Sequence, residues 1–166
     1  MNKFKAAVEK YPVMYYQIVQ EAEPLINGHV LEELRNIKIR KNALKKYLVE
    51  TKEHITSNLE LIELDKLDGS YIKSYSTIYS LVLRLKGIFI IKCILNKLRY
   101  SNKLFKKWLA KNGLKNSEFA QCYDAYTLVR GNKSTSNLKI SALIAEKLLD
   151  ILKKEVNLLE VKLNDK

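Results

Sequence analysis

Aromatic, acidic and cationic side chains lie at helical spacing in the segment from Tyr123 to Lys133. Residues three or four positions apart are neighbours on a helix, so Tyr123, Tyr126 and Arg130 are expected on one face. Gly131 follows at the position where a left-handed residue commonly ends a helix. An arginine at a helix end suits phosphate or carboxylate binding, because its planar guanidinium presents several donors in a fixed geometry. The alternative is a structural arginine that pairs with the acid six residues earlier or caps the carbonyls of its own helix.

The basic residues of the chain are concentrated around this segment. The formal net charge of the 166 residues is +12 at pH 7. Between residues 84 and 133 there are twelve bases but only two acids, Glu118 and Asp124. Such a surplus raises the local concentration of polyanions or of an acidic protein partner, although lysine-rich surfaces also occur without a ligand. The bases are Arg84, Lys86, Lys92, Lys97, Arg99, Lys103, Lys106, Lys107, Lys111, Lys115, Arg130 and Lys133.

Residues that would support catalysis or metal binding do not cluster in the sequence. His29 and His54 are far apart and lack acids at ligand spacing, so neither a metal site nor a cofactor is predicted. Cys93 and Cys122 have no paired spacing and are expected to be reduced thiols of the core, Cys122 the more exposed of the two. Together with the absence of a signal pattern and of a membrane-length apolar run, this predicts a cytoplasmic protein without catalytic residues.

Glycine and proline are scarce and lie between segments of helical periodicity, which predicts an all-α protein. Residues 3–11 and 13–26 are expected to form two N-terminal helices. From Val30 to Ile62 apolar residues recur every three or four positions, which predicts one long amphipathic helix. The turn Asp68-Gly69-Ser70 follows, and Ser70 is the expected N-cap of the next helix.

The second long helix is expected to run to about Leu98. Residues 78–95 are apolar almost all round, which is typical of a helix buried among several others. Tyr71, Tyr75 and Tyr79 recur every four residues on this helix. They are expected to form a core or dimer seam, or else to stack on a base.

Three further helices are expected: a basic one over residues 102–111, the one that ends at Arg130, and a last one through Leu159. With the two long antiparallel helices they predict an up-and-down bundle with a long C-terminal helix. The expected division is an N-terminal helical appendage, residues 1–28, and a bundle domain, residues 29–166. The residues expected to cap the three helices are Ser101, Asn116 or Ser117, and Ser136 or Asn137.

Two short motifs in these helices resemble a known family. They are Ser-Tyr-Ser-Thr-Ile-Tyr-Ser at residues 74–80 and Tyr-Thr-Leu-Val-Arg-Gly-Asn-Lys at residues 126–133. With them the chain resembles HEPN domains, in particular the archaeal helical domains that accompany minimal nucleotidyltransferases. The similarity covers about residues 30–159 and rests mainly on residues 70–133. It implies a helical bundle that pairs as a homodimer and contacts a nucleotide, RNA or a nucleotidyltransferase.

Residues 11–26 resemble the segment that usually ends a catalytic nucleotidyltransferase domain. The Gly-Ser loop and Asp-x-Asp pair of such enzymes are not found, so a detached helical module with its partner on another polypeptide is expected. HEPN ribonucleases carry an Arg-x4–6-His element, in which the histidine relays a proton and the arginine stabilises phosphate charge. No histidine follows Arg130 in this chain, so RNA cleavage is not expected.

The leading hypothesis is a non-catalytic, HEPN-like homodimer that binds a nucleotide, RNA or a minimal nucleotidyltransferase partner, without membrane insertion. One alternative is a divergent HEPN ribonuclease of the toxin type. Another is a structural, antitoxin-like protein whose basic strip meets an acidic surface. The residues expected to bind the ligand or nucleic acid are Tyr79, Arg84, Lys106, Lys107, Tyr123, Asp124, Tyr126, Arg130 and Lys133.

Overall fold

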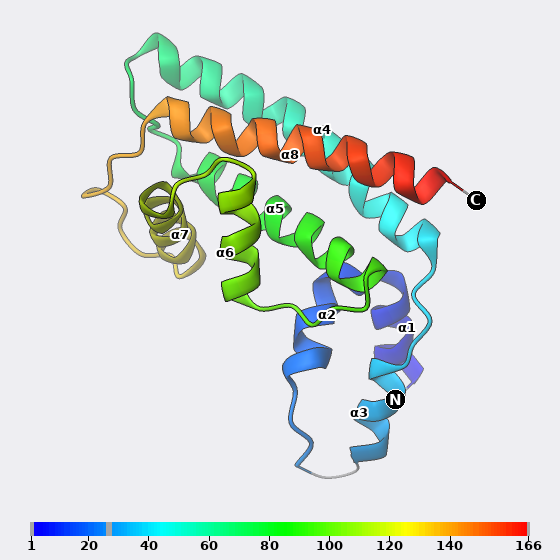
Figure 1. Cartoon of the computed structure of the whole chain (residues 1–166). Coiled ribbons are helices and arrows are strands. Elements are labelled where there is room, and N and C mark those ends of the chain that lie inside the picture. The colour runs from blue at the N-terminus through cyan, green and yellow to red at the C-terminus, as the bar shows by residue number, and fades with distance from the viewer. Residues whose placement is uncertain (1, 26–27, 166) are drawn as a thin grey trace.

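A computed structural model describes residues 2–25 and 28–165 of the chain (Figure 1). Over these residues the regular secondary structure is α-helix, apart from one isolated β-bridge, which confirms the predicted all-α class. The helices are α1 (Asn2–Lys10), α2 (Pro12–Glu21), α3 (Gly28–Arg35), α4 (Lys41–Leu67), α5 (Tyr75–Leu95), α6 (Asn102–Lys111), α7 (Asn116–Arg130) and α8 (Ala142–Asn164).

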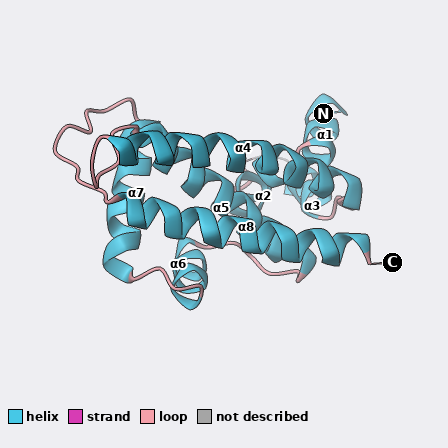
Figure 2. Cartoon of the chain, turned by 90° about the horizontal axis from the view of Figure 1, so that it is seen from above, coloured by secondary structure: helices cyan, strands magenta, loops and turns pink. Residues whose placement is uncertain are grey.

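Three long helices form the centre of the bundle. In Figures 1 and 2, α4 and α8 lie side by side and run in opposite directions, and α5 packs beneath them. Ion pairs join the two outer helices along their length, Lys52 to Glu160 at 2.6 Å and Lys66 to Glu146 at 2.7 Å. The side chains of these pairs are partly exposed, so each pair contributes little to stability.

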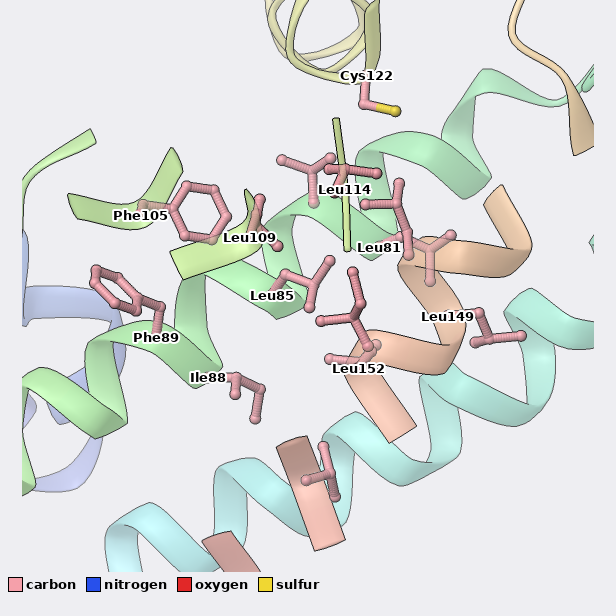
Figure 3. Close-up of a cluster of buried hydrophobic side chains, with 14 of the residues drawn as sticks. Leu81, Leu85, Ile88, Phe89, Phe105, Leu109, Leu114, Cys122, Leu149 and Leu152 are labelled. Carbon is pink, nitrogen blue, oxygen red and sulfur yellow. The ribbon is translucent and has the colours of Figure 1, made fainter. Parts of the chain in front are cut away.

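The core is built around α5. Its residues are buried almost all round, as predicted, because α2, α4, α7 and α8 all pack against it. Figure 3 shows side chains of α5, α6, α7 and α8 pointing toward one another, among them Leu85, Leu109 and Leu152. Despite this apolar character, no helix in the described ranges is both long and apolar enough to cross a membrane.

Both cysteines belong to this core. Cys93 and Cys122 are each 1% exposed, so the prediction of a more exposed Cys122 is wrong. Burial raises the pKa of the Cys122 thiol to about 12, and it raises the pKa of Cys93 as well. A thiol that stays protonated is a poor nucleophile, which leaves both side chains with a packing role.

The predicted helix over residues 30–62 is wrong, because the chain breaks into α3 and α4 at residues 36–40. The Arg35 guanidinium donates to the backbone carbonyls of Val19 at 3.3 Å and Ala22 at 2.9 Å, and these bonds hold α3 against the end of α2. The connecting segment alternates charged residues with β-branched Ile37 and Ile39, which have low helix propensity.

The start of α5 also differs from the prediction. The N-cap residue is Ser74, not Ser70. Just before the helix, the carboxylate of Asp65, on α4, accepts hydrogen bonds from the backbone N–H groups of Lys73 and Ser74 at 3.1 and 3.2 Å. Ser70 pairs with the start of α8, since its carbonyl accepts from the N–H of Ala142 at 2.9 Å. Tyr71 therefore lies outside the helix and is exposed, so its predicted place on this helix and in the core is wrong.

The same pairing delays α8. The N–H of Ile72 donates to the carbonyl of Ile140 at 2.8 Å, which keeps the chain extended up to Ser141. The predicted start at Ser136 or Asn137 is therefore wrong, and α8 begins at Ala142. The carbonyl of Ile140 thus bonds to Ile72 of the loop before α5 and not to a residue of α8.

The shorter helices follow local signals more closely. α6 has the predicted bounds, and the Ser101 hydroxyl accepts from the N–H of Leu104 at 3.2 Å. α7 begins at Asn116, but neither predicted cap residue is used: the Glu118 carboxylate accepts from the N–H of Lys115 at 2.8 Å.

Two N-terminal helices form, but the predicted extent of the second is wrong, because α2 ends at Glu21 and residues 22–25 are not helical. Residue 26, its predicted end, lies outside the described residues. Val13 of α2 belongs to the main core, and the Tyr16 hydroxyl donates to the carbonyl of Leu98 at 2.6 Å. The guanidinium of Arg99 donates to the carbonyl of Gln20 at 3.0 Å. α2 is thus attached to the bundle at several points. The domain boundary expected at residue 28 stays a prediction.

Candidate ligand-binding groove

A groove of about 750 Å³ opens between α2, α4, α5 and α7. One face of α5 forms its floor, through Tyr79, Leu83, Gly87 and Ile90, which are spaced by three or four residues. The other helices form its walls. Its volume lies in the range of pockets that bind a small molecule.

Stacked tyrosines line the groove where α7 packs against α5. The rings of Tyr79 and Tyr126 are stacked with centroids 5.3 Å apart and an interplanar angle of 12°. Tyr123 packs against Tyr126 with centroids 5.6 Å apart. Burial raises the pKa of Tyr126, and the positive charge of Arg130 opposes that shift. The predicted face of Tyr123, Tyr126 and Arg130 is therefore a groove-lining face.

Lys86 is the most buried charged residue of the groove. It is 8% exposed, and its Nζ lies over the ring of Tyr126 at 5.2 Å and over the ring of Tyr100 at 5.8 Å. No acid in the described ranges forms an ion pair with it. Burial lowers the pKa of Lys86 and the charge of Arg130 lowers it further, while Glu21 opposes both effects.

Two arginines complete the cationic lining. The guanidinium of Arg84 lies over the ring of Tyr47, 5.3 Å from its centroid, and Arg130 is the exposed last residue of α7. Within the described part of the chain neither arginine is paired with an acid, so the ion pair considered between Arg130 and Asp124 is not formed. Each guanidinium lies beside a tyrosine, Arg84 beside Tyr47 and Arg130 beside Tyr126, and its charge is not neutralised by a carboxylate of the described residues.

A close contact between α4 and α5 shapes the opposite wall. A Cβ added at Gly87 would lie 1.9 Å from the hydroxyl oxygen of Tyr47, so only glycine allows this ring to cross α5 as it does. Burial raises the pKa of Tyr47, and the charge of Arg84 opposes that shift. The tyrosine is thereby held between the floor of the groove and the arginine.

The structure brings together five of the residues predicted from the sequence. Tyr79, Arg84, Tyr123, Tyr126 and Arg130 all line the groove, although they come from two helices. The other four do not line it: the remaining predicted residues are Lys106 and Lys107 on α6, Asp124 on the exposed side of α7, and Lys133 beyond its end.

The turn after Arg130 differs from the prediction. Gly131 has a φ of −85°, and the left-handed residue is Asn132, with a φ of 52°. The N–H of Lys133 closes the turn on the carbonyl of Leu128 at 2.9 Å. Asparagine tolerates this left-handed conformation better than most residues. The left-handed residue therefore lies one position after Gly131, where the sequence had predicted it.

Sequence reasoning missed several groove residues. Lys86 and Gly87 interrupt an otherwise apolar run of α5, and a charged residue in such a run was a usable signal. Tyr47 carries no local signal of this kind. Met14 and Ile18 of α2, which are 64% and 56% exposed, line the groove only because α2 folds back onto the bundle.

Comparison of the chain with models of protein families, with curated proteins and with solved structures finds no match at a significant level. The ligand class must therefore be inferred from the residues that line the groove. Cationic donors without acid partners stand beside aromatic rings and an exposed apolar wall. This combination is suited to a ligand that is anionic at one end and flat and apolar at the other.

Proposed function

We propose that the protein binds a nucleotide, free or as part of an RNA, in the groove between α2, α4, α5 and α7, and does not cleave it. The observation that carries this proposal is the presence of three cations without acid partners, Arg84, Lys86 and Arg130, beside a tyrosine stack. Phosphate oxygens accept hydrogen bonds from such cations, and bases stack on aromatic side chains.

The charge of the lining favours an anion. Five cationic side chains and two acidic ones line the groove, which leaves a surplus of three positive charges. A concave site with one dominant sign of charge focuses its field and attracts ligands of the opposite sign. The cations are Lys10, Lys46, Arg84, Lys86 and Arg130, and the acids are Glu21 and Glu50.

Apolar and aromatic side chains of the groove offer surface for a base. Met14 and Ile18 of α2 and Leu83 of α5 are exposed side chains that line the groove, and the half-buried Tyr123 of α7 lines it as well. Apolar and aromatic groups of this kind bury the faces of a base, whereas its edges stay free for water or polar contacts. A base between α2 and α7 would leave its phosphate near the cations.

The basic face of α6 extends the proposal from a nucleotide to RNA. Asn102, the first residue of α6, lines the groove, and exposed lysines follow it along the helix. Lys106 and Lys107 are proposed to contact the phosphates of a bound strand. Binding of RNA should then weaken steeply with salt and also after Lys106→Glu or Lys107→Glu.

The absence of cleavage is part of the proposal. General base catalysis at neutral pH is commonly supplied by histidine, and the residues that line the groove in the described ranges include none. Labelled RNA incubated with the protein should therefore be recovered intact. Metal-independent cleavage that disappears in Arg130→Ala would instead support the ribonuclease alternative.

Binding can be tested by isothermal titration of the whole chain with the four ribonucleoside monophosphates and with a short single-stranded RNA. Arg130→Ala should weaken binding about tenfold, because it removes charge-assisted hydrogen bonds. Lys139→Ala is the matched control, since it removes one exposed positive charge outside the groove. The proposal fails if no nucleotide or RNA binds, or if both variants weaken binding equally.

The resemblance to HEPN domains and the homodimer are also proposed here. The order of two long helices, two short ones and a long last helix supports the resemblance. Leu61, Leu64 and Leu67 are exposed on α4 and support a second copy, or a nucleotidyltransferase partner, at that surface. Sedimentation of the chain as a monomer at micromolar concentration would exclude the homodimer.

A further inference from the structure

Lys86 occupies an unusual position for a charged residue. Its side chain is 8% exposed, and it contributes to the lining of the groove from the floor. The rings of Tyr126 and Tyr100 hold its Nζ at 5.2 and 5.8 Å from their centroids. An aromatic face stabilises an ammonium only in part, and a buried charge without an acid normally requires a counter-ion. A ligand anion would supply the missing partner.

Arg130 adds a second cation to the groove, beside Tyr126, the same tyrosine whose ring lies under the Lys86 ammonium. It comes from α7, whereas Lys86 comes from α5, and both line the groove. The positive charge of Arg130 lowers the pKa of Lys86, because two like charges near each other repel. Glu21 of α2 is the acid that faces Lys86, but it forms an ion pair with neither residue in the described ranges.

The geometry points to a subsite for a phosphate monoester at Lys86 and Arg130, so that the ligand is a nucleoside monophosphate or the phosphorylated end of an RNA strand. This inference rests on the proposed function and specifies which part of the nucleotide the groove selects. Two neighbouring cations match the two negative charges of a monoester better than the single charge of a diester.

Burial leads to the same choice. An internal phosphate of a strand brings a sugar on each side, whereas a terminal phosphate brings only one. A side chain that is 8% exposed is more easily reached by the smaller, terminal group. The base would then lie toward the exposed wall formed by Met14 and Ile18.

The experiment compares ligands with and without the monoester. The whole chain is titrated with adenosine monophosphate and with adenosine, and inorganic phosphate is added as a competitor. Adenosine monophosphate should bind on the order of tenfold to a hundredfold more tightly than adenosine, as expected for charge-assisted hydrogen bonds. In Lys86→Met this advantage should disappear while adenosine binds as before.

Two controls separate binding from stability. Lys154→Met replaces an exposed lysine of α8 outside the groove and should leave the advantage of the monophosphate unchanged. Lys86→Gln gives a second readout at the same position if the methionine variant fails to fold. A lysine with a packing role alone would change the melting temperature in both Lys86 variants but not the preference for the monophosphate.

A second arm identifies the source of the phosphate. A short RNA with a phosphate at its 5′ or 3′ end is compared with the same RNA ending in hydroxyl groups. Tighter binding of one phosphorylated RNA assigns the subsite to a strand end, and tight binding of the mononucleotide alone assigns it to a free nucleotide. If ligands with and without the monoester bind equally in both arms, the inference is wrong but the proposed nucleotide binding is not. If no probe binds, the proposed function itself is wrong.

Discussion

Lys86 and Lys92 lie on the same helix, six residues apart, and both are placed over aromatic rings, yet only one has an acid partner. Lys92 forms an ion pair with Glu155 of α8, which is 4% exposed, and its Nζ lies 5.4 Å from the ring of Trp108. Lys86 is the more buried residue but has no such pair in the described ranges.

The difference comes from what each side of α5 faces. On the side of Lys92, α8 packs against α5 and brings Glu155 from 63 positions away. On the side of Lys86 the neighbouring helices leave a groove. A paired lysine helps to hold two helices together, whereas an unpaired one is available to a ligand, and the following predictions test that contrast.

The largest effect is expected where the existing pair is broken. Glu155→Ala should lower the free energy of unfolding by about 3 kcal/mol, because it leaves the Lys92 ammonium without its partner and opens a cavity beside it. Glu155→Gln keeps the shape and an acceptor and should lose less. Urea denaturation followed by circular dichroism measures both. A loss below about 0.5 kcal/mol would mean that the pair does not stabilise this side of the bundle.

A smaller loss is expected at the wall of the groove. Gly87→Ala should cost about 1–2 kcal/mol, because the added methyl group overlaps the Tyr47 ring and displaces it. In a Tyr47→Ala background the same substitution should be neutral or stabilising, since alanine has the higher helix propensity. Equal losses in both backgrounds would show that the contact with Tyr47 is not responsible. Nucleotide titration of the single variant then reports the contribution of this wall.

The smallest effect has the opposite sign. Lys86→Met should raise the free energy of unfolding by about 1 kcal/mol at pH 7, because it removes a buried charge that has no acid partner. Lys154→Met, at an exposed position, should change it little. A loss of stability in Lys86→Met would show that the tyrosine rings compensate the charge fully.

This gain should also depend on pH. Burial holds the pKa of Lys86 below its ordinary value of 10.5, so between the two values the unfolded chain binds more protons than the folded one. Stability of the natural protein contributed by this group therefore rises with pH in that window. The gain of Lys86→Met should shrink as the pH rises from 7 toward 10, as measured by denaturation at each pH. A constant gain would contradict the lowered pKa.

Local signals predicted some elements of the fold and failed at others. α6 has its predicted bounds because Ser101 and Gly113 lie next to the residues they cap, with Gly113 at a φ of 97°. The break before α4 depends instead on Arg35 reaching the carbonyls at the end of α2. The start of α8 depends on a hydrogen bond from Ile72. Neither partner is near in sequence, so periodicity alone could not show these boundaries.

The candidate site divides in the same way. The spacing of Tyr123, Tyr126 and Arg130 was sufficient to predict their shared face, because a helix fixes which neighbours meet every three or four residues. Met14 and Ile18 joined them only when α2 packed against the bundle. The α7 face of the groove could therefore be predicted from the sequence, whereas the α2 wall could be found only from the packed structure.

The sequence by itself determined that the chain is helical, that α5 is buried and that basic residues surround it, since periodicity and composition are local properties. Only the tertiary structure decided which of these basic residues would be neutralised. Lys86 and Lys92 look alike along the chain, but an ion pair needs two groups within about 4 Å. Packing of α8 against α5 brings Glu155 to Lys92, whereas no acid of the described residues pairs with Lys86. A buried positive charge therefore stays at the floor of the groove.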